Sequence, residues 1–163
     1  MNFLQKTFLS FFGIGFIPFA PGTWGSLASI PLLYVFSILH LSQIVMFGLT
    51  VSLTFISIIV AESYQKKYKL HDPQWIVIDE VLGMLIAWSF YPDFSATTLI
   101  ILFILFRIFD ISKPWPASYF DRMTHGAGTI LDDIVCGIYV GIILSLLNYF
   151  HMLAYIPSIF DKL

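Results

Sequence analysis

The stretch IVIDEVLGMLIAW, residues 76–88, places two adjacent carboxylates, Asp79 and Glu80, directly before a run of apolar side chains. The whole chain has the same character, because 58% of its 163 residues are hydrophobic, only 11% are charged, and its mean hydropathy is +0.87. Soluble domains carry about 25% charged residues. A chain this short would expose too much apolar surface in water, so its composition predicts one domain embedded in a lipid bilayer.

Polar loops divide the apolar sequence into five segments in which we expect helices: residues 26–41, 43–62, 76–91, 96–112 and 132–151. The predicted fold class is all-α, a polytopic integral membrane helical bundle of about five apolar helices. A full span takes about 20 residues, with a lower limit near 17. The first and third segments are shorter than this, so we expect them to be tilted, distorted or seated beside a thinned bilayer.

The basic residues gather on one side of the expected bundle. If the helices cross in sequence, the N-terminus and the loops 63–75 and 113–131 share a face. That face carries Lys6, Lys66, Lys67, Lys69, Lys113 and Arg122, with Arg107 in the helix leading to it, whereas the opposite face has only Lys162. By the positive-inside rule the shared face is cytoplasmic.

The acidic residues follow the same distribution, which the positive-inside rule does not require. Near the cytoplasmic face lie Glu62, Asp72, Asp79, Glu80, Asp110, Asp121, Asp132 and Asp133, and only Asp93 and Asp161 fall outside. Carboxylates beside hydrocarbon are costly unless they are paired, hydrated or bound to a cation. Their gathering therefore predicts a polar site that faces the cytoplasm.

A second acidic pair opens the stretch LDDIVCGIYVG, residues 131–141, where Asp133, Gly137 and Gly141 follow at intervals of four. Small residues at this spacing let another helix approach closely, and the same face offers a possible homodimer contact. Two facing acidic pairs would repel each other unless a cation lay between them, and oxygen ligands suit Mg²⁺ or another hard divalent ion. The predicted metal ligands are Asp79, Glu80, Asp132 and Asp133. Each pair alone has a simpler explanation, since acidic residues at a helix N-terminus are favoured by the helix dipole.

The stretch FRIFDISKPWP, residues 106–116, supplies positive charge, because Arg107, Asp110 and Lys113 lie three residues apart on one helix face. They are either an internal ladder of ion pairs or a functional set. In the second case Arg107 and Lys113 bind an anion, and Asp110 ligates the metal or orients Arg107.

The stretch PGTWGS, residues 21–26, is expected to form a turn just before the first apolar helix. Backbone N–H groups at a helix N-terminus bind anions, and Thr23 and Ser26 add hydroxyl donors. A capped turn without a ligand is the alternative. In the flexible run THGAGTILDD, His125 could protonate a leaving group, although an exposed loop histidine is the commoner case.

Other classes of protein are excluded by composition or by missing motifs. The net charge of −2 and the lack of a basic stripe argue against a nucleic-acid partner. The single cysteine, Cys136, permits no intrachain disulfide, and position 142 is not the arginine that a cysteine phosphatase loop needs. The histidines form no zinc set, and PGTWGS lacks the ending of a nucleotide-binding P-loop. Residues 7–20 have a poor cleavage site for a signal peptide, so we expect a short amphipathic or re-entrant segment there.

In their order and spacing, PGTWGS, DEVLG, FRIFDISKPWP and DDIVCG closely resemble the phosphatidylglycerophosphatase A family, from about Gly13 to Ile143. The resemblance implies an enzyme of the bacterial cytoplasmic (inner) membrane that uses Mg²⁺ to hydrolyse the terminal phosphomonoester of the lipid phosphatidylglycerophosphate. Residues 1–163 would then form a single membrane-embedded phosphatase domain. Two positions depart from the family pattern, which has Gly-Gly at Gly126-Ala127 and alanine at Cys136. Both replacements are small, so neither disturbs the expected site.

On this reading the catalytic residues are Asp79, Glu80, Asp110, Asp132 and Asp133, and the phosphate-binding residues are Thr23, Ser26, Arg107 and Lys113. The alternative is a small membrane transporter or channel, in which the charges line an ion path. A conduit needs polar residues through the depth of the bilayer, whereas the middle of the second, fourth and fifth helices is apolar. A non-catalytic assembly subunit would leave the acidic pairs unexplained.

Overall fold

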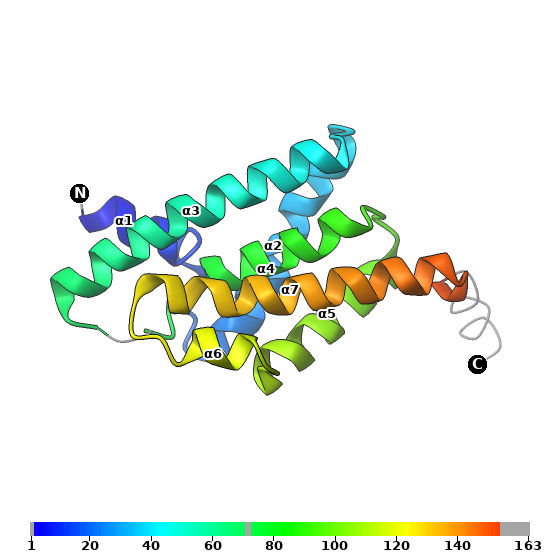
Figure 1. Ribbon diagram of the computed structural model, residues 1–163. Coiled ribbons are helices and arrows are strands. Elements are labelled where there is room, and N and C mark those ends of the chain that lie inside the picture. The colour runs from blue at the N-terminus through cyan, green and yellow to red at the C-terminus, as the bar shows by residue number, and fades with distance from the viewer. Residues whose placement is uncertain (1, 71–72, 154–163) are drawn as a thin grey trace.

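The computed structural model describes residues 2–70 and 73–153, which form helices packed side by side (Figure 1). In chain order these are α1 (Asn2–Leu9), the 3₁₀ helix η1 (Ile14–Phe16), α2 (Pro21–Ile38), α3 (Gln43–Tyr68), α4 (Ile78–Phe90), α5 (Ala96–Ser112), α6 (Ala117–Asp121) and α7 (Gly126–Tyr149). The residues that the structure describes contain no strand, so the all-α class is confirmed.

Helices occupy all five expected segments, but two of them begin earlier than predicted. The first begins at Pro21, because proline is well suited to the first position of a helix, so PGTWGS is helical and the predicted turn is wrong. The last begins at Gly126, six residues before the predicted start, because Glu62 of α3 accepts a hydrogen bond from the Gly126 N–H. A cap supplied by a distant helix leaves no local signal.

The other bounds lie closer to prediction. The helix predicted over 96–112 is observed with those bounds, and the third helix is shortened to Ile78–Phe90. Helix α3 continues to Tyr68, through a basic last turn that the helix dipole favours.

Within residues 2–70 and 73–153, two helices are long and apolar enough to cross a membrane by length and composition: α3, with a mean hydropathy of 2.5, and α7, with 2.2. Together they support membrane association. A bundle in which five apolar helices cross the bilayer stays a prediction, since α4 and α5 have only 13 and 17 residues.

Helix α4 is the centre of the bundle, and almost all of its residues are buried. Its closest partner is α7, and the two meet through glycines: a Cβ on Gly83 would lie 2.7 Å from the Asp133 carbonyl oxygen, and a Cβ on Gly137 would collide with the Gly83 carbonyl oxygen. The close packing predicted for this small-residue face is confirmed. The face is used inside the chain, so a homodimer would need another surface. Cys136 is buried in the same region, as expected for a small packed residue.

The N-terminal segment lies beside the C-terminal half of α3 (Figure 1). Leu9 and Ser10 are fully buried, and the Val77 N–H donates to the Leu9 carbonyl oxygen at 3.0 Å. The Lys6 ammonium lies 5.0 Å from the centre of the Phe16 ring. The segment therefore packs against the entrance to α4, close to the cavity described next.

Candidate active site

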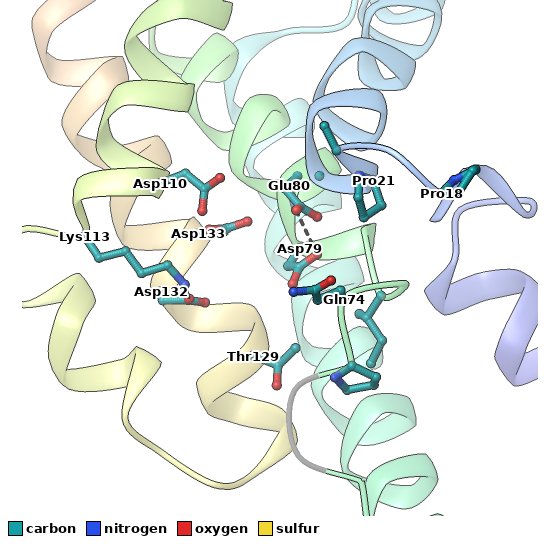
Figure 2. A pocket seen from close by; sticks show the side chains of 14 residues that line it. Pro18, Pro21, Gln74, Asp79, Glu80, Asp110, Lys113, Thr129, Asp132 and Asp133 are labelled. Carbon is teal, nitrogen blue, oxygen red and sulfur yellow. Dashed lines mark hydrogen bonds and ion pairs between the residues drawn. The ribbon is translucent and has the colours of Figure 1, made fainter. Parts of the chain in front are cut away.

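A cavity of about 400 Å³ opens at the end of the bundle where α2, α4 and α7 begin and α5 ends (Figure 2). Its lining residues are Pro18, Ala20, Pro21, Gly22, Pro73, Gln74, Ile76, Asp79, Glu80, Asp110, Lys113, Thr129, Asp132 and Asp133. The cavity brings together all five carboxylates that we predicted to be catalytic, together with one of the predicted phosphate-binding residues, Lys113.

Three of these carboxylates form a compact cluster, called the acidic group below: Asp79, Glu80 and Asp133 each offer one oxygen, and these oxygens lie within 4.8 Å of one another. Asp79 and Glu80 come from the first turn of α4, and Asp133 comes from the second turn of α7. The glycine contact between Gly83 and Gly137 sets this distance, because it lets the two helix backbones touch.

The acidic group has the donor set of a hard-cation site. Asp79 is 8% exposed and Asp133 is 3% exposed. Oε2 of Glu80 and Oδ1 of Asp133 are buried, and no hydrogen-bond donor for either lies in the described part of the chain. Buried carboxylate oxygens without donors are costly unless a cation neutralises them. Three convergent oxygen ligands therefore fit Mg²⁺ or a similar ion.

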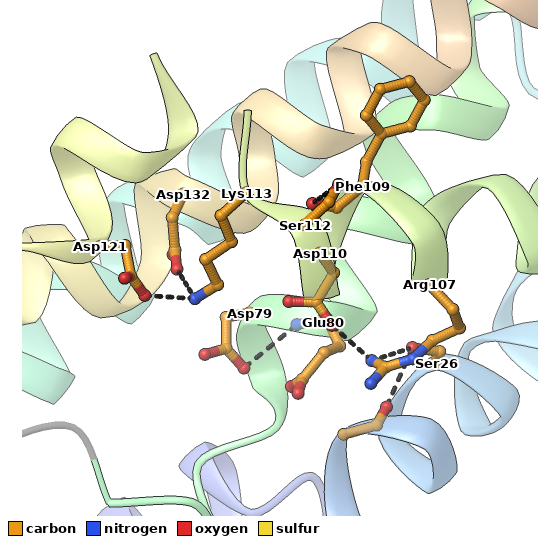
Figure 3. Close-up of polar contacts among 11 residues, drawn as sticks. Ser26, Asp79, Glu80, Arg107, Phe109, Asp110, Ser112, Lys113, Asp121 and Asp132 are labelled. Carbon is orange, nitrogen blue, oxygen red and sulfur yellow. Dashed lines mark hydrogen bonds and ion pairs between the residues drawn. The ribbon is translucent and has the colours of Figure 1, made fainter. Parts of the chain in front are cut away.

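Asp132 lies beside this group and is held by Lys113. The Lys113 Nζ is 2.5 Å from Asp132 Oδ2 and 2.5 Å from Asp121 Oδ1 (Figure 3). Burial lowers the pKa of the Lys113 ammonium, but the charge of Asp132 and hydrogen bonds to both carboxylates outweigh burial and raise that pKa above its ordinary value. Lys113 therefore faces the cavity as a cation.

Arg107 reaches the same region from behind the cavity wall. Its Nη1 lies 2.6 Å from Asp110 Oδ2 and 3.4 Å from Ser26 Oγ (Figure 3). The ladder considered for this helix is present only in its first half, because Lys113 pairs with Asp121 and Asp132 rather than with Asp110. The contact supports the other interpretation of Asp110, in which it orients Arg107.

The first glycine of PGTWGS, Gly22, has a different purpose from the predicted turn. A Cβ on Gly22 would collide with Glu80 Oε1 and lie 3.2 Å from Arg107 Nη1. Gly22 therefore lets the start of α2 touch both side chains. Ser26 is fully buried and donates its hydroxyl to the Gly22 carbonyl oxygen at 2.9 Å. Neither Ser26 nor Thr23 is among the residues that line the cavity.

His125 lies in a different place from the acidic group. It is the N-cap of α7, and it lines a second cavity of about 270 Å³ with Glu62, Gln65, Lys66, Lys69, Leu70 and Thr124. Its Nδ1 is 3.9 Å from Glu62 Oε1, and its side chain is 66% exposed. The exposed-histidine interpretation matches this position better than a role at the leaving group.

Two polar residues of the main cavity were missed by the sequence analysis. Thr129 lies three residues before Asp132, so the helical repeat before the acidic pair could have indicated it. Gln74 comes from the segment before α4, and no spacing in the sequence points to it. The apolar wall formed by Pro18, Pro21 and Ile76 was likewise not predicted.

Comparison with known proteins places this helical, membrane-associated chain among the lipid phosphatases. The family model described as phosphatidylglycerophosphatase A matches residues 7–148, so the chain belongs to the phosphatidylglycerophosphatase A family. The phosphatidylglycerophosphatase A of Escherichia coli (strain K12) is 39% identical over 131 residues, which are 78% of this chain and 73% of that protein.

Two further relatives extend the comparison. The phosphatidylglycerophosphatase A of Haemophilus influenzae is 36% identical over 143 residues, 86% of each chain. A Bacteroides thetaiotaomicron protein named "Putative phosphatidylinositol-3-phosphatase" is 33% identical over 153 residues, 91% of this chain and 96% of that one. No solved structure matches the chain.

Proposed function

We propose that this protein hydrolyses the terminal phosphomonoester of phosphatidylglycerophosphate, giving phosphatidylglycerol and inorganic phosphate, with Mg²⁺ as its cofactor. The observation that carries the proposal is the acidic group, whose buried oxygens converge beside Lys113 in a member of this family. The lipid headgroup would enter the cavity from the membrane surface.

The cation would be held by Asp79, Glu80 and Asp133. When bound, Mg²⁺ neutralises phosphoryl oxygens and lowers the pKa of a water molecule. Asp132, which we predicted as a fourth ligand, instead contacts Lys113. We assign it the task of aiming the ammonium at the phosphate.

The remaining residues bind and orient the phosphate. Phosphoryl transfer depends chiefly on positioning and on neutralising charge over the equatorial oxygens. The Lys113 ammonium supplies this charge inside the cavity. Arg107 supplies a second positive charge from behind the wall, and its guanidinium is fixed by Asp110 on one side and Ser26 on the other.

The cavity is proposed to face the cytoplasm of a multi-pass protein in the bacterial inner membrane. The described lysines lie at the cavity end of the bundle: Lys6 in α1, Lys66 and Lys67 in the last turn of α3, Lys69 directly after α3, and Lys113 directly after α5. The positive-inside rule places such an end in the cytoplasm.

A second substrate merits direct comparison because of the Bacteroides relative, whose printed name refers to a phosphatidylinositol 3-phosphatase. The headgroup of phosphatidylinositol 3-phosphate also carries a phosphomonoester beside a lipid phosphodiester. The same cavity chemistry would serve both, so substrate choice must be measured. A transporter finds less support, because α3 and α7 are apolar along most of their length and the charges form a one-sided pocket.

The test is phosphate release by the detergent-purified protein from phosphatidylglycerophosphate and from phosphatidylinositol 3-phosphate. We expect Mg²⁺-dependent release from the first lipid, and a loss of about a hundredfold or more in Glu80→Gln. Asp93→Asn is a matched control, since this carboxylate lies at the other end of α4 and α5. There it accepts hydrogen bonds from the hydroxyl groups of Ser95 and Thr98. Full activity in excess chelator would reject the metal site. Release from neither lipid would reject the proposed function.

A further inference from the structure

We propose that two polar side chains of α3, Glu62 and Gln65, are positioning residues that fix α7 along its axis and thereby place Asp133 in the acidic group. This inference rests on the proposed function, because it concerns the site that would hold the cation. It assigns a task to two side chains that are not among the residues lining the active cavity.

The two side chains contact α7 at points one turn apart. Oε2 of Glu62 accepts a hydrogen bond from the Gly126 N–H at 2.6 Å. Nε2 of Gln65 donates to Thr129 Oγ1 at 2.9 Å, and both of these residues are buried. Residues 62 and 65 of α3 therefore lie opposite residues 126 and 129 of α7, with the same three-residue spacing on both helices. Asp133 lies four residues after Thr129, on the next turn of the same helix.

The backbones are in contact at the first of these points, so the spacing between the helices is also fixed. A Cβ on Gly126 would collide with the Glu62 nitrogen and lie 2.7 Å from the Glu62 Cα. The Glu62 carboxylate is itself held by Lys66, whose Nζ lies 2.8 Å from Oε1. A shift of α7 along α3 would therefore break the hydrogen bond between Glu62 and Gly126 and disturb the contact between the two backbones.

Directional contacts matter here because the face of α7 toward α4 contributes little to fixing its height beside the acidic group. At this seam of small residues Gly137 packs against Gly83, and Gly141 packs against the Phe90 ring. The α7–α4 hydrogen bond given by the described residues, from Ser145 Oγ to the Phe90 carbonyl oxygen at 3.4 Å, lies twelve residues beyond Asp133. The carboxylates of the acidic group repel one another across that seam. A slide of one residue moves a helix by about 1.5 Å, whereas Mg²⁺ holds its ligands at about 2.0–2.1 Å in a strict geometry. Hydrogen bonds from α3 oppose that slide.

The Gln65–Thr129 hydrogen bond also separates the two cavities. Thr129 lines the main cavity, whereas Gln65 lines the second cavity, on the other side of the bond. A change at Gln65 therefore leaves the lining of the active cavity unchanged. An effect on cation affinity must then pass through Thr129 and α7.

The experiment combines Gln65→Met, which keeps the side-chain volume, with Thr129→Val, Thr129→Ser and the Gln65→Met/Thr129→Val double variant. The measurements are the Mg²⁺ concentration that gives half-maximal hydrolysis and, independently of activity, Mn²⁺ binding to the purified protein by electron paramagnetic resonance. Loss of residues that orient metal ligands weakens metal affinity by about 10- to 100-fold. We expect the affinity for Mg²⁺ and Mn²⁺ to fall at least tenfold in Gln65→Met and in Thr129→Val and to stay at the wild-type level in Thr129→Ser. The double variant should bind the ions no more weakly than either single variant.

The matched control is Ser63→Ala, an exposed position on the same turn of α3, which should leave both measurements unchanged. Mn²⁺ affinity within twofold of wild type in folded Gln65→Met would overturn the inference. So would additive losses in the double variant, because they would mean that Thr129 acts on the ligand directly. If Gln65→Met fails to fold, Glu62→Ala removes the partly exposed cap and must weaken Mn²⁺ binding for the inference to stand. Inactive wild-type protein that binds Mn²⁺ would reject only the proposed function.

Discussion

Replacing Gly137 by alanine tests whether the close approach of α4 and α7 builds the acidic group. A Cβ at this position would collide with the Gly83 carbonyl oxygen and lie 3.0 Å from the Gly83 carbonyl carbon. Ordinary Cβ contacts begin at 3.4 Å, whereas this one would bring the Cβ about 1 Å closer to the oxygen than that, so the helices must separate by about 1 Å. Overpacking of this kind costs about 1–3 kcal/mol, while alanine gains about 1 kcal/mol over glycine in a helix.

The same displacement moves Asp133 away from Asp79 and Glu80. Functional groups must be held to within about 0.5 Å, so we expect the half-saturating Mg²⁺ concentration of Gly137→Ala to rise about tenfold or more, with a lower Tm. Gly48→Ala on α3 is the matched control, because nothing lies within 4 Å of a Cβ there. It should keep the wild-type Mg²⁺ response and should not lower Tm. A wild-type Mg²⁺ response in Gly137→Ala would refute the idea that the glycine seam sets the site.

Three further predictions follow from the geometry. Lys113→Met should lower kcat/KM for the lipid about tenfold or more. Because the Lys113 pKa is raised, the positive charge and the stability that its ion pairs contribute persist below the ordinary pKa of 10.5 and are lost only as pH rises beyond that value. Lys113→Arg should therefore leave the pH–rate profile below about pH 10 unchanged. Thr23→Ala should keep kcat/KM within about threefold of wild type, because Thr23 does not line the cavity, and a tenfold loss would restore its predicted phosphate contact. In a Cys136→Ser background, an impermeant thiol reagent should label Ala96→Cys in intact cells but label Arg122→Cys only after permeabilisation, and the reverse pattern would place the cavity outside the cytoplasm.

Much of the fold was predictable because apolar runs and polar loops are local properties of the sequence. The segment 96–112 shows this best, with a serine N-cap at one end and a lysine in the left-handed conformation at the other. The start of α7 was missed for the opposite reason. Its cap comes from Glu62, which is 64 residues away in the chain, and the glycines that predicted a flexible loop instead let the two backbones meet.

The five carboxylates of the cavity were predictable from the sequence, but their arrangement and the positions of Thr23 and Ser26 outside the lining were not. Adjacent residues on a helix point about 100° apart, yet the neighbours Asp79 and Glu80 both join the acidic group, so adjacency alone does not decide which carboxylates converge. Asp133 joins the acidic group, and Asp132 instead meets Lys113. The sequence shows the pair of aspartates, but only the packing of α5 and α6 against α7 decides that Asp132, rather than Asp133, pairs with the Lys113 ammonium.

This division of tasks explains how a cavity rich in carboxylates can accept a phosphate. Among the described residues, five carboxylates line it, whereas Lys113 is the one cationic side chain of the lining, with Arg107 close behind. By itself such a cavity repels a phosphate dianion more than it attracts one. Two of the five, Asp110 and Asp132, form ion pairs with the two cationic side chains. Asp79, Glu80 and Asp133 would hold the proposed cation, whose charge would offset theirs, and Lys113 would then supply further positive charge to the lipid phosphate.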